Sequence, residues 1–241
     1  MTAKVQAMVM IGALMVFVCG CSGRIKYPSY YTLSIAPAVQ PSPESAQPSV
    51  TIAVQRFITP PYLRQGRIVY RESPNEVNFY EYHRWASDLG AAITTALVEG
   101  LRSPSRIALE EPAYNKDQSD YVLSGKLEEL DEIDFEGEVK VAAKVSAKLK
   151  DSRTGFILWS GGVHRETTVD RRDVDDVARQ MSNALQASVN ELLGSVEKTI
   201  AEANGEASFR IKSYEAATDH VVETVLKALR YLEFALHTRW S

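Results

Sequence analysis

The chain has 241 residues, a formal net charge of −4 and a charged-residue content of 24%, and its mean hydropathy is −0.19. This composition is typical of a globular body in water, and the length suits one domain of ordinary size with additional segments. The charge balance is mildly acidic and Lys and Arg do not cluster. We therefore expect no nucleic-acid partner, because nucleic-acid binding requires a basic footprint.

The chain opens with a short apolar run from Val5 to Val18. This run fits the roughly 7–15 apolar residues of a secretory signal and is shorter than the 18 or so that span a bilayer. It ends in Val18-Cys19-Gly20-Cys21, which resembles the lipobox of bacterial lipoproteins: an aliphatic residue three positions before a cysteine and a small residue directly before it. The sequence predicts a signal peptide over residues 1–20 and lipidation of Cys21. The alternative is an uncleaved anchor or a buried hydrophobic strand.

Cysteine usage agrees with this interpretation, because Cys19 and Cys21 are the only two cysteines. After cleavage the folded part has no thiol, which excludes disulfides, thiolate metal sites and thiol nucleophiles. We expect no cofactor, and only covalent lipid on Cys21: an N-acyl chain such as palmitate and a diacylglycerol. The chain would then be anchored to a membrane without spanning it. Residue 22 is Ser and not Asp, which by the usual sorting rule favours the outer membrane, facing the periplasm, over the inner membrane.

Several short strands are expected in the first hundred residues. Residues 21–49 comprise the lipidated N-terminus, a β-branched and aromatic strand from Tyr30 to Ile35, and a proline-rich linker. Strands follow at Val50 to Ile58, Arg67 to Arg71 and Glu76 to Tyr80. A helix is then expected from Trp85 to Leu101, because its apolar residues recur at helical spacing before Ser103-Pro104 ends it.

The clearest strand pattern lies between Val139 and Leu149, where apolar residues alternate with mostly charged or polar ones. Alternation of this kind indicates a sheet with one buried and one solvated face. The segments Tyr121 to Phe135 and Phe156 to Val169 flank it as hairpin partners. The acidic stretch from Glu128 to Glu138 begins in the first of these segments, and we expect it to form a solvated hairpin tip and not a calcium loop.

Two helices are expected to complete the chain. The first runs from Asp173, a candidate N-cap, to Ala203 and is broken by Asn204-Gly205. The second covers residues 214–238. The predicted fold class is α+β: an antiparallel β-sheet with two main helices packed on one face, plus an extra C-terminal helix. The domain would span residues 50–204, and the amphipathic helix in 205–241 would pack on its own domain, on another copy or on a membrane surface.

The order of local motifs over about residues 21–200 is similar to that of the ABC-type transport auxiliary lipoprotein family, whose known members include the paraquat-inducible C-like lipoproteins. The motifs are, in order, Tyr31-Thr32-Leu33, Ile52-Ala53-Val54, Pro61-Tyr62-Leu63, Ile68-Val69-Tyr70-Arg71, His83-Arg84-Trp85-Ala86 and the Asp151…Gly155…Leu158-Trp159 hairpin. The chain departs from the family pattern at Ser87-Asp88, where an acidic residue and a proline are common. Residues 205–241 fall outside the resemblance.

The resemblance implies an auxiliary component of an ABC transport system that moves lipids or other hydrophobic molecules across the cell envelope. Its partners would be a protein with mammalian-cell-entry (MCE) domains and the ABC permease and ATPase of the same system. ATP hydrolysis would belong to the ATPase, so the chain itself would not be an enzyme. The alternative is a structural envelope lipoprotein that assembles with itself and supports membrane integrity without handling lipid.

The positions around the Pro60-Pro61 loop that match the family are candidates for a partner interface, because aromatic residues and Arg are enriched at the centres of interfaces. The candidates are Tyr62, Leu63, Tyr70, Arg71 and Trp85. For Tyr70 and Trp85 the alternative is closure of the core, and for Arg71 it is pairing with a nearby acid. The four histidines lack the spacing of metal ligands. No nucleophile elbow, phosphate-binding loop or catalytic triad is evident.

Overall fold

The structure is a computed structural model of the chain, and it describes residues 26–36, 50–103, 106–111, 119–135 and 137–238. Its centre is an antiparallel meander of three long strands: β6 (Tyr121–Ile133), β7 (Lys140–Asp151) and β8 (Ile157–Thr168). β7 follows the predicted alternation, since its odd-numbered residues from Val141 to Leu149 are buried while Lys144 and Lys148 are exposed. The prediction of this three-stranded meander is confirmed.

The other edge of β6 pairs with two shorter strands that run parallel to it. β2 (Val50–Val54) pairs with the first residues of β6, and β3 (Arg67–Arg71) pairs with the last. A short 3-10 helix, η1 (Leu63–Gln65), lies between them in the sequence. β2 and β3 therefore share one edge of β6 and extend the sheet in two branches.

Each branch continues outward by further pairing. β5 (Arg106–Glu110) runs parallel to β2; β4 (Asn78–Trp85) is antiparallel to β3, and β1 (Ser29–Tyr31) runs parallel to β4. The result is an eight-stranded mixed sheet in an α+β fold. The antiparallel pairing that we predicted is found in the meander and between β3 and β4. The parallel pairs arise because β2, β3 and β5 are separated by connections long enough to reverse the chain.

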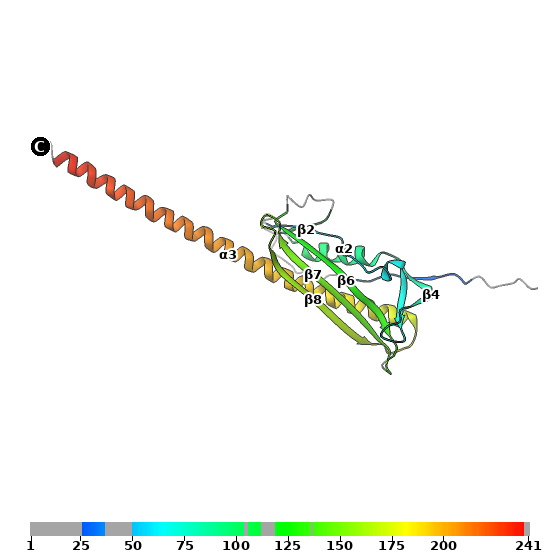
Figure 1. Cartoon of the computed structure of the whole chain (residues 1–241). Helices are drawn as coiled ribbons and strands as arrows, with labels where there is room; N and C mark the ends of the chain where they lie inside the picture. Colours follow the sequence, from blue (N-terminus) through cyan, green and yellow to red (C-terminus); the bar gives the residue numbers. More distant parts are fainter. Residues whose placement is uncertain (1–25, 37–49, 104–105, 112–118, 136, 239–241) are drawn as a thin grey trace, which may run out of the picture.

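Two helices, α2 (Leu89–Leu101) and α3 (Val174–Thr238), lie together on one face of the sheet, as Figure 1 shows. α2 begins four residues later than predicted, because Trp85 is the last residue of β4. The side chain of Asp88 caps the helix by accepting the backbone N–H of Ala91 at 2.8 Å. The space between the sheet and the helices is filled by one cluster of buried side chains from the sheet and both helices.

α3 corrects the prediction of two separate C-terminal helices, because it is a single helix of 65 residues that continues through Asn204-Gly205. The glycine costs only about 1 kcal/mol relative to alanine in a helix, no proline is near, and Ala and Glu flank the pair on both sides. The first half of α3 covers the sheet. The second half, orange to red in Figure 1, projects beyond the end of the sheet.

Candidate functional site

The N-terminal strand and the first turn of α3 meet at a junction of polar side chains. The hydroxyl of Tyr31 in β1 donates to Asp175 Oδ1 at 2.7 Å and lies 2.8 Å from His83 Nδ1 in β4. Because one hydroxyl donates only once, the hydrogen between Tyr31 and His83 must come from His83 Nδ1. Burial and the hydrogen bond to Asp175 raise the pKa of Tyr31 to about 12. β1, β4 and α3 are therefore connected through one neutral tyrosine.

A second pair extends the junction into the sheet. Tyr80 in β4 donates its hydroxyl to Glu132 Oε2 at 2.8 Å, and its ring lies 4.8 Å from that of Tyr70 and 5.7 Å from the ring of His83. Burial raises the pKa of Glu132, and burial together with Glu132 raises the pKa of Tyr80. The junction thus joins β1, β3, β4, β6 and α3 by side-chain contacts.

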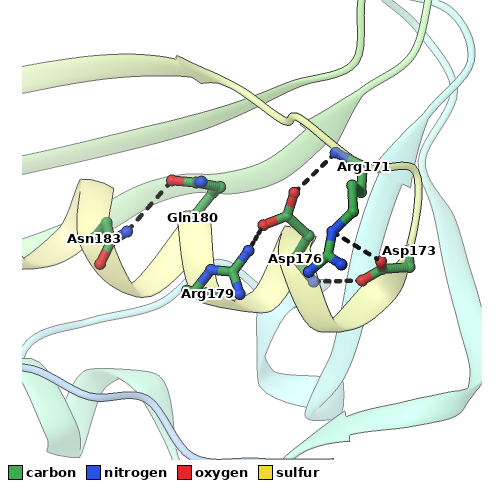
Figure 2. Close-up of polar contacts among 6 residues, drawn as sticks. All are labelled: Arg171, Asp173, Asp176, Arg179, Gln180 and Asn183. Atoms are coloured by element: carbon green, nitrogen blue, oxygen red, sulfur yellow. Dashed lines mark hydrogen bonds and ion pairs between the residues drawn. The ribbon is translucent and has the colours of Figure 1, made fainter.

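The start of α3 is held by a network of acids and arginines, drawn in Figure 2. Asp173 Oδ1 accepts the backbone N–H of Asp176 at 2.8 Å, which confirms the predicted N-cap. Asp176 is fully buried and accepts the backbone N–H of Arg171 at 2.9 Å and the guanidinium of Arg179. The backbone hydrogen bond from Arg171 holds the pKa of Asp176 below its usual range despite burial. These contacts fix the direction in which α3 leaves the junction.

A buried ion pair lies elsewhere on β6, at its pairing with β3. Asp131 is fully buried, and Arg71 Nε donates to its Oδ2 at 2.5 Å. The hydroxyl of Tyr62 lies 3.5 Å from the same oxygen and donates to the carbonyl oxygen of Glu128 at 3.3 Å. Among the described residues, nothing hydrogen-bonds to Asp131 Oδ1. Burial raises the pKa of Asp131 although Arg71 and Tyr62 oppose that change.

The five predicted interface candidates divide into two groups. Leu63 and Trp85 are only 2% and 5% exposed and belong to the core, so their side chains are not presented to a partner. Tyr62 and Arg71 lie half-buried around Asp131, and Tyr70 packs on Tyr80 in the junction. A partner contact by the half-buried residues stays a prediction. Cys21 lies outside the described residues.

The prediction that the stretch from Glu128 to Glu138 is a solvated hairpin tip is wrong for its middle. Asp131 is fully buried and Glu132 is only 5% exposed, because β6 continues to Ile133 and the turn comes later. The apolar residues Leu127, directly before the acidic stretch, and Leu130 and Ile133 within it are the available signal of a longer strand. The partners Arg71 and Tyr80 come from distant sequence, and local pattern does not reveal them.

Acidic side chains of these clusters connect separate elements of the fold. Within the described parts of the chain, no group of three or more His, Cys, Asp or Glu side chains is arranged to bind a metal ion. A search of the same residues for a helix that is long and apolar enough to cross a membrane finds none. The acids Asp131, Glu132, Asp175 and Asp176 are already engaged by tyrosine or arginine.

Together these features define a class of protein: an α+β domain whose N-terminal strand is fastened to the start of a long helix. The model of the ABC-type transport auxiliary lipoprotein component family matches residues 31–192. The chain therefore belongs to this family, as its motifs suggested. Among curated proteins, none matches the chain.

Solved structures share the fold at low sequence identity. Protein XCC0632 from Xanthomonas campestris has a TM-score of 0.63 at 19% identity, covering 73% of this chain and 99% of its own. A second, uncharacterized protein has a TM-score of 0.55 at 18% identity, covering 71% and 99%. A single-residue variant of PelC from Paraburkholderia phytofirmans, a dodecamer, reaches only 0.40 at 18% identity, with 64% and 93% covered. The first two similarities establish the fold alone.

Proposed function

We propose that the chain is a non-catalytic adaptor, anchored in the outer membrane by lipid on Cys21 and facing the periplasm. In this role it assists an ABC transport system that moves lipids or other hydrophobic molecules across the envelope. An MCE-domain protein, a permease and an ATPase supply the conduit and the energy. Membership of the auxiliary lipoprotein family supports the coarse part of this proposal.

The observation that carries the adaptor role is the junction at the start of α3. Tyr31 lies ten residues after the predicted lipidation site and binds Asp175 in the first turn of the helix. A lipid anchor on Cys21 would therefore hold α3 at its N-terminal end. The space between sheet and helices is occupied by packed side chains. For the part of the chain that the structure describes, both features favour a protein that positions partners over one that carries cargo between its sheet and its helices.

The alternative function, a self-assembling structural lipoprotein, is favoured by one surface feature. Among the described strands β8 pairs only with β7, so its other edge carries unpaired backbone groups. Phe156, directly before β8, is 73% exposed, and Ile157 and Leu158 at its start are 58% and 39% exposed. An apolar sheet edge of this kind suits contact with a second copy.

Lipid exchange between the membranes separates the two functions. In cells that lack the chain, pulse-labelled phospholipid is followed from the inner to the outer membrane and back. If the chain is an adaptor, we expect a changed exchange rate, restored by the wild-type chain and not by the Cys21→Ala variant. An unchanged exchange rate with a leaky outer membrane would contradict the adaptor role and support the structural alternative.

A further inference from the structure

A hollow of about 400 Å³ lies on the face of the meander that is turned away from the helices. Its floor is made of two registered rows across β6, β7 and β8. In the first row Lys148 lies between Ser124 and Ser160, and in the second Lys126 lies beside Ser146. Facing residues on paired strands place their side chains on the same side of the sheet, about 5 Å apart. Ammonium and hydroxyl groups therefore gather over a small area.

Glycine keeps part of this floor open. Gly162 completes the second row beside Ser146. A Cβ atom at Gly162 would lie 3.6 Å from the Cβ of Ser146 and 3.3 Å from the carbonyl oxygen of Val145. A side chain longer than that of alanine would extend from this contact over the second row, and glycine leaves that end of the row uncovered.

The hollow carries a net positive charge. Its one acid, Glu128, accepts the hydroxyl of Ser146 at 2.7 Å and lies within 3.7 Å of Lys126 and 3.3 Å of Lys144. These contacts, the serine hydroxyl first, hold the pKa of Glu128 below its usual range. Its nearer cation is Lys144, so Glu128 does not cancel the combined charge of Lys126 and Lys148. Lys148 has no carboxylate partner among the residues that the structure describes. A second anion could pair with it.

The rim of the hollow has an apolar side. Ile58, between β2 and η1, is 68% exposed, and its position is fixed by backbone hydrogen bonds to Gly125 and from Leu127 at 3.0 and 2.9 Å. Gln55 also lines the hollow. A ligand with an anionic head and an apolar neighbouring part would contact both surfaces.

We propose that this hollow binds a phosphoryl group, held by Lys126 and Lys148 with the hydroxyls of Ser124 and Ser160. Phosphate oxygens accept hydrogen bonds from ammonium and hydroxyl groups, and charge-assisted hydrogen bonds are the stronger kind. The volume is within the range of small-ligand sites. The phosphoryl group belongs either to a phospholipid headgroup or to a soluble phosphate ester. The phospholipid source rests on the proposed function, whereas phosphoryl binding itself does not.

Calorimetry on the purified full-length lipoprotein in a non-ionic detergent tests the proposal. The probes are sn-glycerol 3-phosphate and two short-chain lipids below their own micelle concentrations, dihexanoyl phosphatidylglycerol and dihexanoyl phosphatidylcholine. The Lys126→Gln/Lys148→Gln double variant removes both ammonium groups from exposed positions. Lys198→Gln is the matched control, since Lys198 is 77% exposed on α3. Thermal melting by circular dichroism verifies that each variant is folded.

We expect saturable binding of glycerol 3-phosphate that weakens at least about tenfold in the double variant and is unchanged in Lys198→Gln. With ¹⁵N-glycine labelling, the amide signals of Gly125 and Gly162 should shift on binding while that of Gly194 in α3 does not. Absence of saturable binding for every probe, or equal affinity in the double variant, would overturn the proposal.

The two sources give different results within this experiment. If phosphatidylglycerol binds about tenfold more tightly than glycerol 3-phosphate, and Ile58→Ser removes this difference, the phosphoryl group belongs to a lipid headgroup. Equal affinities for the two identify a soluble phosphate ester. If glycerol 3-phosphate binds and phosphatidylglycerol binds no more tightly, this hollow does not handle lipid. The adaptor function is then tested separately by the lipid exchange measurement.

Discussion

Asp131 is the residue whose environment departs most from that of an ordinary strand position. One of its oxygens binds Arg71, and the other is buried without a hydrogen-bond partner among the described residues. An isolated carboxylate in such a place costs several kcal/mol, so Arg71 is needed for Asp131 to be tolerated in its charged form. The ion pair also holds β3 and the loop of Tyr62 against β6, because the side chains of Arg71 and Tyr62 both contact the carboxylate of Asp131.

Replacing Arg71 by leucine should lower the free energy of unfolding by about 3 kcal/mol, because it leaves Asp131 buried without its cation. The pKa of Asp131 is already raised by burial and should rise further in Arg71→Leu. The folded variant then binds a proton at pH values where the unfolded chain has released it, so its stability increases as the pH falls from neutral toward the ordinary range of an aspartate. Urea denaturation at several pH values measures this.

The double variant Arg71→Leu/Asp131→Asn serves as the control, because it removes the buried charge as well. It should recover part of the stability lost near neutral pH and lose the pH dependence. If Arg71→Leu is as stable as the wild type under these conditions, the ion pair is not needed in the fold.

Tyr31 is the residue that fastens β1, and Tyr31→Phe should cost about 1 kcal/mol by removing one hydroxyl. Amide hydrogen exchange in Ser29–Tyr31 should become faster, because β1 is three residues long and would lose its side-chain link to α3. The folded pKa of Tyr31 is about 12 against an ordinary value of 10.0. The wild type should therefore lose stability as the pH rises between these two values, and Tyr31→Phe should lose less of it. Unchanged exchange in β1 would show that Asp175 does not hold the strand.

At the residue scale the sequence reveals only what is local. Asp173 was predictable as a cap because capping is set by neighbours along the chain. The roles of Asp131 and Glu132 could not be predicted, because their partners are separated from them by 60 and 52 residues. A run of acidic residues is therefore predicted to be solvated, although in the fold arginine and tyrosine from distant sequence pack against it.

At the scale of the element, α3 is the part of the chain that differs most from the prediction. The first half buries an apolar stripe that includes Val177, Met181, Leu185, Val189 and Val196. Packing of that stripe explains why this half is helical, since helices gain most of their stability from such burial. The continuation past Gly205 is one helix with the packed half, so helix formation there needs no new nucleation.

Gly205 allows a direct test of that continuity. Gly205→Pro should interrupt the helix, reduce the circular dichroism signal of helical structure and create a protease-sensitive site near this position. Gly205→Ala should do the opposite and raise the thermal stability of the helix, since no atom lies within 4 Å of a Cβ placed there. If Gly205→Pro leaves both the signal and the proteolysis pattern unchanged, the helix is already interrupted at this point.

The strands show what pattern can and cannot predict. The meander was predictable because alternation and turn residues are local, and Gly137 and Gly155 take the positive φ values that such turns require. The parallel pairing of β2 and β3 with β6 could not be predicted, because pairing over long connections depends on which strand edges remain free in the fold. Leu63 and Trp85 were candidates for an interface, with the core as the alternative for Trp85, because aromatic and aliphatic side chains are common both in interfaces and in cores.

At the scale of the whole molecule, the chain has two distinct ends. The predicted anchor, Cys21, is eight residues from Ser29, so it reaches at most about 30 Å from β1. α3 starts at the same end, where Asp175 binds Tyr31. A helix of 65 residues is about 97 Å long. With lipid on Cys21, the far end of α3 can therefore lie well away from the membrane surface, where partners of a transport system can contact it.

Membrane choice is testable at residue 22. The predicted outer-membrane location rests on serine at this position, so Ser22→Asp should move the lipoprotein to the inner-membrane fraction in a sucrose gradient. Ser22→Ala is the control and should stay in the outer-membrane fraction. Recovery of the wild type with the inner membrane would contradict the proposed location.

The most direct test of the adaptor function is affinity purification of the tagged, full-length lipoprotein from membranes in mild detergent, followed by mass spectrometry of proteins and lipids. We predict recovery of an MCE-domain protein together with its permease or ATPase, reduced when Cys21→Ala removes the anchor. Recovery of the chain alone, as a defined oligomer without transport subunits or lipid, would contradict the adaptor function and favour the structural one.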